Sequence, residues 1–186
     1  TSRVGHALKQ QGYRVISNDH NTYAHKLATC YVQADRDQLL DDVEQLVDEC
    51  NAIAPQPGWF TETFCLQSRF IHPRNGARID AIREHLAGLD LPPELEAVML
   101  VSLMEAADRV DSTTGVQTAY LKKWAARAMK DMKMRVPDFL PQSANGKGEA
   151  HCLDAAEAAA RFEVDVAYLD QPYNQHSYLG NYHVWE

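Results

Sequence analysis

Several features that would assign this 186-residue sequence to a familiar class are absent. No run of 18 or more apolar residues occurs, so we expect neither a membrane span nor a membrane partner. The four cysteines (Cys30, Cys50, Cys65 and Cys152) form no Cys-x-x-Cys pair and show no zinc-ligand spacing. The sequence therefore predicts free thiols in a reducing cytoplasm, without disulfides and without a bound metal.

The first residues also lack two common features. They read Thr-Ser-Arg-Val-Gly, with no initiator Met and no apolar stretch typical of a signal peptide. The hydrophobic content of 45% is enough for one domain with a real core. We expect this chain to be a fragment that is cut short at both ends.

Positive charge is scarce, with 18 Lys and Arg against 26 Asp and Glu, and this balance does not by itself favour a nucleic-acid partner. The distribution is uneven, however. Residues 35–49 hold seven acidic residues and one basic residue, whereas residues 117–136 hold six basic residues and one acidic residue. Such a cluster is either a solvated surface or a phosphate-binding surface. A second basic cluster consists of Arg69, Arg74, Arg78 and Arg83. The candidate DNA-binding residues from the two basic clusters are Arg69, Arg74, Arg78, Lys122, Lys123 and Arg127.

Strand patterns occur only near the two ends of the chain. They cover residues 13–17, 150–153 and 164–169, and a helix over about 3–11 precedes the first and ends at Gly12. An Ala- and Glu-rich helix over 154–162, with Asp154 as its N-cap, separates the last two. Strand, helix and strand with short connections predict a βαβ unit in a parallel sheet.

The middle of the chain has helical patterns. Apolar residues recur at helical spacing over 39–47 and over 95–106, the latter after Pro92 and Pro93, and a third helix is predicted over 119–132. Residues 51–75 hold three prolines and several aromatics, which predicts a packed but irregular segment. We therefore divide the chain into an α/β part, residues 1–35 and 148–186, and a helical insert, residues 36–147.

The most informative stretch is an apolar strand that runs directly into Asp170, Pro172 and Tyr173. In a parallel α/β sheet the ligand site lies outside the carboxyl ends of the strands, so these residues would face it. An ordinary exit from a strand into a loop, with a buried Tyr, explains the same pattern.

Five blocks carry a resemblance to a known family. They are Thr1-Ser-Arg-Val-Gly-His-Ala-Leu-Lys9, Gly12-Tyr-Arg-Val-Ile-Ser-Asn-Asp19, Asn75-Gly-Ala-Arg-Ile-Asp-Ala-Ile-Arg83, Asp108-Arg-Val-Asp-Ser-Thr-Thr-Gly115 and Asp170-Gln-Pro-Tyr173 with its continuation to Trp185. In this order they resemble the Dam-type N6-adenine DNA methyltransferases, whose tetrapeptide is Asp-Pro-Pro-Tyr. The resemblance implies a Rossmann-like S-adenosylmethionine-dependent methyltransferase sheet with a mostly helical insert that recognises double-stranded DNA.

The resemblance also implies roles for the tetrapeptide. Asp170 and the main-chain carbonyl of Gln171 would accept the two N–H bonds of an adenine amine, which frees its lone pair for the sulfonium methyl. Pro172 belongs to the same turn, and Tyr173 would stack on the base. A base inside a duplex cannot reach such a pocket, so the target adenine would be flipped out.

Further residues are assigned in the same way. Thr1 and Ser2 resemble the tail of the cofactor loop, Asp19 the acid that binds ribose, and Asp154 the acid that faces the cofactor's adenine. Asp19 and Asp154 have the alternative role of helix N-caps. Tyr178 and Tyr182 would contact DNA or close over the base, whereas His176 and His183 suit polar packing better than a metal site.

The sequence departs from the family at Gln171, which stands where the tetrapeptide has its first proline and so loses a fixed φ. The front half of the glycine-rich loop and its strand are also missing, so we expect this fragment to bind S-adenosylmethionine weakly or not at all. Two alternatives stay open: an amino-methyltransferase acting on RNA or protein glutamine, and a DNA-binding relic without activity. A cognate restriction endonuclease would be a further partner.

Overall fold

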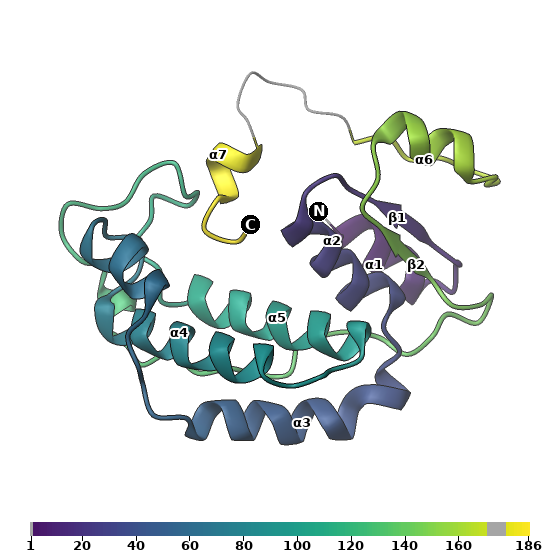
Figure 1. Cartoon of the computed structure of the whole chain (residues 1–186). Helices are drawn as coiled ribbons and strands as arrows, with labels where there is room; N and C mark the ends of the chain where they lie inside the picture. Colours follow the sequence, from purple (N-terminus) through teal and green to yellow (C-terminus); the bar gives the residue numbers. More distant parts are fainter. Residues whose placement is uncertain (1, 171–177) are drawn as a thin grey trace.

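The computed structural model describes residues 2–170 and 178–186, arranged as a small sheet with covering helices beside a larger group of helices (Figure 1). Thr1, Gln171, Pro172 and Tyr173 lie outside these residues. The elements are α1 (Arg3–Gln10), β1 (Ile16–Asn18), α2 (Thr22–Ala28), the π-helix η1 (Thr29–Gln33), α3 (Arg36–Ala52), the π-helix η2 (Thr61–Leu66), α4 (Pro73–Ala87), α5 (Pro93–Asp108), the 3₁₀ helix η3 (Ala126–Met129), β2 (Glu149–His151), α6 (Ala155–Arg161) and α7 (Tyr178–Tyr182).

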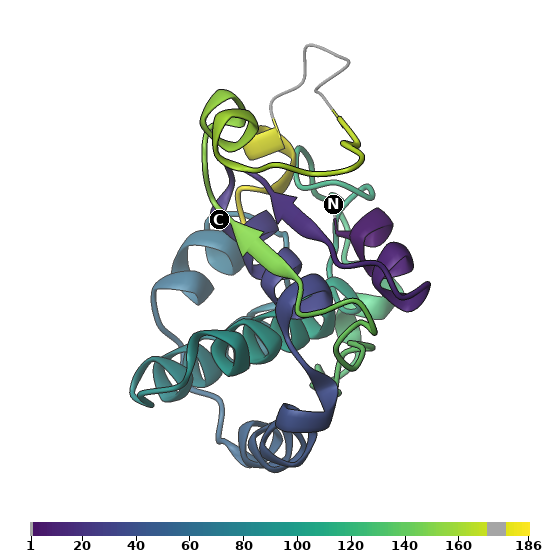
Figure 2. The same cartoon turned by 90° about the vertical axis from the view of Figure 1, so that its right-hand side faces the viewer.

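The two described strands, β1 and β2, pair in parallel with Ser17 opposite Ala150. Figure 2 shows them side by side and pointing the same way, although more than a hundred residues separate them in the sequence. A parallel sheet is thus present as predicted, although its pair is β1 with β2 and not the predicted pair of 150–153 with 164–169; both strands are displaced by one to three residues from the predicted ranges. Helix α1 ends as predicted, because Gly12 has a φ of 88° that other residues rarely adopt.

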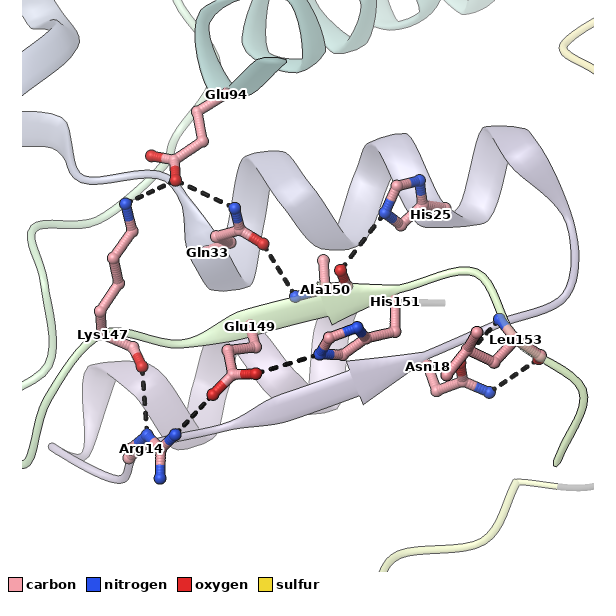
Figure 3. A network of polar contacts seen from close by, with 10 residues as sticks. All are labelled: Arg14, Asn18, His25, Gln33, Glu94, Lys147, Glu149, Ala150, His151 and Leu153. Carbon is pink, nitrogen blue, oxygen red and sulfur yellow. Dashed lines mark hydrogen bonds and ion pairs between the residues drawn. The ribbon is translucent and has the colours of Figure 1, made fainter. Parts of the chain in front are cut away.

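A polar network closes the outer edge of β2 (Figure 3). The backbone N–H of Ala150 donates to Oε1 of Gln33 at 2.9 Å, and its carbonyl contacts Nε2 of His25 at 3.3 Å. The amide of Gln33 is fixed in turn by Glu94, which also pairs with Lys147 at 2.5 Å. Because side chains satisfy the outward backbone groups of β2, no further strand can pair on this side.

Three long helices, α3, α4 and α5, form most of the core. Figure 1 shows α4 and α5 side by side with α3 beneath them. Nine of the sixteen residues of helix α5 are buried, which explains why its sequence is apolar on most faces. The helices predicted over 39–47 and 95–106 are confirmed, and α5 begins with Pro93 in its first turn. None of the helices within the described ranges has the length and apolar character needed to cross a membrane.

The helix predicted over 119–132 is wrong. Only η3 is helical there, and the chain then runs extended across the helices to about residue 140. The amide of Asn75 replaces the helical bonds, because Oδ1 accepts from Met132 N–H at 3.0 Å and Nδ2 donates to the Lys130 carbonyl at 2.9 Å. Asn51 holds the N–H and carbonyl of Met134 in the same way. Two side-chain amides, of the buried Asn75 and the half-buried Asn51, thus take the place of a neighbouring strand.

The strand predicted over 164–169 is also not formed. Residues 164–170 are outside any helix or strand, and Val166 and Leu169 are each 85% exposed. The helix between the second and third predicted strands is present as α6, with Asp154 accepting from Ala156 N–H at 2.8 Å as its N-cap. The βαβ unit is therefore present only as its first strand and its helix.

The two ends of residues 36–147, the segment predicted as a helical insert, lie next to each other. Arg36 N–H donates to the Leu140 carbonyl at 3.2 Å, and Gln142 N–H donates to Oδ1 of Asp35 at 3.2 Å. The buried Nζ of Lys9 donates to the Leu140 carbonyl and to the Ala34 carbonyl. Burial lowers the pKa of Lys9, and Asp35 partly opposes this shift. The described cysteines are free thiols, as predicted, and only Cys152 is exposed.

Candidate active site

The site begins at the carboxyl ends of β1 and β2. Asp19 follows β1, and its N–H donates to the His151 carbonyl at 3.2 Å. The side-chain amide of Asn18 extends the pairing, since Nδ2 donates to the Leu153 carbonyl and Oδ1 accepts from Leu153 N–H, both at 3.0 Å. Asp154 comes directly after Leu153. Both predicted cofactor acids therefore lie at the same edge of the sheet.

The half-buried carboxylate of Asp19 has one oxygen that could accept hydrogen bonds from the two hydroxyls of a diol. Its Oδ1 accepts from the backbone N–H and the side-chain Nδ2 of Asn21, at 2.9 and 3.0 Å. Its Oδ2 makes no hydrogen bond with any described residue. The N-cap position of α2 is occupied by Asn21, so Asp19 is not needed as the cap. Asp154, by contrast, does serve as an N-cap, and its side chain is exposed.

The remaining predicted cofactor and catalytic residues are only partly described. Ser2 is buried at the start of α1, and its carbonyl accepts from His6 N–H at 2.8 Å. Asp170 is exposed at the end of the segment that leaves α6. Thr1, Gln171, Pro172 and Tyr173 lie outside the described residues, so the geometry of the tetrapeptide stays a prediction.

Aromatic rings gather where the chain returns after the tetrapeptide. Tyr178 and Tyr182 are stacked at 6.4 Å between ring centroids, and Tyr182 lies 5.5 Å from the ring of Tyr23 on α2. Tyr23 is buried, and desolvation raises the pKa of its phenol well above its usual range, with a further contribution from Asp19. Sequence reasoning singled out Tyr178 and Tyr182 but missed Tyr23.

His183 packs against rings of the insert. Its ring centroid lies 5.3 Å from that of Phe70 and 5.9 Å from that of Phe64. His176 lies outside the described residues. Within residues 2–170 and 178–186 no group of three or more His, Cys, Asp and Glu side chains is placed to hold a metal ion.

Two of the predicted DNA-binding arginines are bound within the insert. Arg127 forms an ion pair with Asp111 at 2.5 Å, and its Nε donates to the same residue. Arg69 donates to the carbonyl of Lys122 and lies over the ring of Trp124 at 5.8 Å. These contacts fix the loop between α5 and η3.

Two more arginines make contacts along α4. Arg74 donates to the Met129 carbonyl at 2.6 Å, and Arg78 donates to the Asn51 carbonyl at 3.1 Å. An open groove of about 620 Å³ lies between these arginines and the extended segment. The two other predicted contacts, Lys122 and Lys123, are exposed, and neither pairs with an acidic side chain in the described part of the chain.

Comparisons with known proteins identify the family of the chain. The whole chain, residues 1–186, matches D12 class N6 adenine-specific DNA methyltransferases, so it belongs to this family. It is 27% identical over 192 residues to the Type II methyltransferase M.NlaIII of Neisseria lactamica, covering 99% of this chain and 56% of that protein. It is 31% identical over 183 residues to M.CviAII of Paramecium bursaria Chlorella virus 1, covering 96% of this chain and 55% of that one.

The modification methylase StsI of Streptococcus sanguinis is 31% identical over 124 residues, which are 64% of this chain and 19% of that enzyme. No solved structure matches the chain. The chain thus spans about half the length of the first two relatives. The family match confirms the resemblance that the five sequence blocks indicated.

Proposed function

We propose that the full-length protein transfers a methyl group from S-adenosylmethionine to the N6 amine of adenine in DNA. The observation that carries this proposal is the family match over the whole chain, with Asp19 and Asp154 at neighbouring strand ends. Its relatives are named as Type II methyltransferases or modification methylases. A modification role beside a cognate restriction endonuclease follows as part of the same proposal.

The two strands would belong to a larger Rossmann-like sheet that continues past β1. Because Ser17 faces β2, the backbone groups of Ile16 and Asn18 point the other way. They make no hydrogen bond with a described residue, whereas the outer edge of β2 is closed by Gln33 and His25. A strand before Thr1 would pair with this free edge, and residues 164–169 would join beyond it and bury their apolar side chains.

The cofactor would lie across the edge that Asp19 and Asp154 share. Oδ2 of Asp19 would accept hydrogen bonds from the ribose hydroxyls, since Oδ1 is already occupied by Asn21. Asp154 would face the adenine ring, with Thr1 and Ser2 at the cofactor loop. When bound, S-adenosylmethionine supplies an electrophilic methyl group on a sulfonium centre.

The amine of the target adenine would be held by the tetrapeptide. Asp170 would accept one N–H and the Gln171 carbonyl the other, on a turn stiffened by Pro172, while Tyr173 would stack on the base. Positioning and electrostatics then account for most of the rate enhancement. The adenine has to be flipped out of the duplex to reach this turn, at a cost of a few kcal/mol.

Residues 36–147 would form the DNA-recognition insert, joined to the α/β part (residues 1–35 and 148–186) at the junction of Arg36 and Leu140. Lys122 and Lys123 are exposed and unpaired in the described structure, so they suit phosphate contact best. Arg69, Arg74, Arg78 and Arg127 would contribute from the same surface while retaining their internal contacts. Tyr178 and Tyr182 would lie near the flipped base.

The test is methyl incorporation by the full-length protein into adenine of double-stranded DNA, with RNA and protein substrates as controls. We expect Asp170→Ala to lower the rate about 100-fold or more. Asp165→Ala, an exposed acid in the same segment, should leave the rate within about twofold. Incorporation into RNA or protein instead of DNA would refute the proposed substrate.

Comparing the wild-type protein with Gln171→Pro tests whether the protein is an active enzyme or a relic without activity. A full-length protein that is active with Gln171, and faster as Gln171→Pro, supports catalysis with a loosened turn. Activity only in Gln171→Pro would show that the natural protein is a DNA-binding relic.

A further inference from the structure

The residues that follow the tetrapeptide join the helical insert to the α/β part. We call Tyr178–Glu186, which includes α7, the C-terminal strap. Figure 1 shows α7 near the loops of the insert, with the end of the chain close to the start of α2. The strap is bound at both places, to the insert through its backbone and to the start of α2 through the side chain of Glu186.

On the insert, the strap is held by Gln117, a residue that is 5% exposed. The N–H of Gln117 donates to the Asn181 carbonyl at 2.9 Å, and its Oε1 accepts from Val184 N–H at 2.9 Å. One residue thus satisfies two backbone groups of the strap. The packing of His183 against Phe70 adds an aromatic contact next to these bonds.

On the α/β part, the strap is held by Glu186. Its Oε1 accepts from Thr22 N–H and its Oε2 from Tyr23 N–H, both at 3.0 Å. Burial alone would raise the pKa of Glu186, but the hydrogen bonds from Tyr23 and Thr22 outweigh it and hold the pKa below its usual value. A charged carboxylate therefore lies at the positive end of α2.

Helix α2 depends on this carboxylate because its own N-cap residue, Asn21, makes no side-chain capping bond. Its amide donates instead to Asp19, the acid proposed to hold the ribose. Two carboxylates thus accept hydrogen bonds from three consecutive backbone N–H groups of one turn. Asp19 takes that of Asn21, and Glu186 takes those of Thr22 and Tyr23.

We propose that Glu186 is a positioning residue for cofactor binding, which caps α2 and thereby fixes the turn that orients Asp19. Gln117 supports it from the insert by holding the strap in place. This inference rests on the proposed function, since it assumes that Asp19 binds the ribose. Without the Glu186 carboxylate, two N–H groups at the start of α2 lose their acceptors, and the turn that carries Asp19 loosens.

The test is calorimetric binding of S-adenosylhomocysteine to the full-length protein. We expect Glu186→Ala to raise the Kd about tenfold, the size of effect that loss of a helix cap produces. Glu186→Gln keeps only one of the two oxygen acceptors, so we expect an intermediate rise in the Kd, of about threefold. Glu44→Ala, an exposed acid of α3, is the matched control and should bind as wild type. The calorimetric stoichiometry gives the fraction of protein that is folded and able to bind. A weaker Kd at unchanged stoichiometry is therefore distinguished from loss of the fold.

A second variant tests the strap itself. Gln117→Leu lies on the insert, yet it should raise the same Kd about threefold or more, because the strap loses an acceptor for Val184 N–H. If the wild-type protein binds and methylates DNA but Glu186→Ala binds S-adenosylhomocysteine as tightly as wild type, this inference is refuted and the proposed function is not. A wild-type protein that binds no S-adenosylhomocysteine would refute the proposed function, and the inference with it.

Discussion

The carboxylate of Asp80 is the clearest target for a stability measurement. Asp80 lies on α4, is 9% exposed and accepts from three backbone N–H groups of the irregular segment before it. These are Gly58 at 2.8 Å, Phe60 at 2.9 Å and Thr61 at 2.8 Å, and the hydroxyl of Thr61 adds a fourth bond at 2.6 Å. One side chain therefore fixes the start of η2 against α4.

The expected effect follows from those four bonds. Asp80→Ala leaves two buried donors of Thr61 and two part-buried N–H groups without an acceptor, and we expect a loss of about 3–4 kcal/mol in the free energy of unfolding. Asp80→Asn keeps one oxygen but loses the charge, so its loss should be about 2 kcal/mol. Glu84→Gln, an exposed acid on the same helix, is the control and should change stability by less than about 0.5 kcal/mol.

The pH dependence has a definite sign. Burial alone would raise the pKa of Asp80, but the hydrogen bonds from Thr61, Phe60 and Gly58 hold it below its ordinary value. The stabilisation is therefore complete above the unfolded pKa of about 3.9 and is lost as the pH falls through the folded pKa. The difference between wild type and Asp80→Asn should shrink below about pH 4.

The assay is urea unfolding of the full-length protein followed by circular dichroism, at several pH values between 3 and 7. The slope of the transition shows whether each variant unfolds as the wild type does. A loss below about 1 kcal/mol for Asp80→Ala would refute the reasoning, as would a difference that does not change with pH.

Three further substitutions test the packing and the backbone, each by the shift in the urea midpoint. Gly148→Ala should cost about 2 kcal/mol or more, because its Cβ would lie 2.5 Å from the Val32 carbonyl oxygen, a backbone atom that cannot move aside. Asn75→Leu should cost about 3 kcal/mol, because the buried N–H of Met132 loses its acceptor; a neutral result would show that the extended segment needs no such partner. Gly12→Ala should cost about 1 kcal/mol through its φ of 88°, with no clash to contribute, and an unchanged midpoint would contradict that explanation.

The elements that could be predicted from the sequence are those whose bonds are local. The apolar spacing of α5, the start at Pro93 and the cap at Asp154 each depend on residues a few positions apart. The shared edge of Asp19 and Asp154 was also predictable, because parallel strands end on the same side of a sheet. In these cases local pattern and tertiary structure agree.

The failures depend on distant partners. Residues 119–132 have good helical composition, but Asn75 bonds Met132 and Asn51 bonds Met134 just beyond, and no local pattern shows these hydrogen bonds. Residues 164–169 have a strand pattern, but a strand needs a neighbour to pair with. The contact of Glu186 with Tyr23 spans 163 residues, and neither residue carries a motif.

The junction between Arg36 and Leu140 has a consequence for the order of folding. Pairing β1 with β2 directly would close a loop of more than a hundred residues, with an entropic cost of about 4 kcal/mol. Once α3, α4 and α5 have collapsed and this junction has formed, only short stretches remain between the two strands. We therefore expect the helices to form early and the strands to pair late, in keeping with the slow formation of non-local contacts.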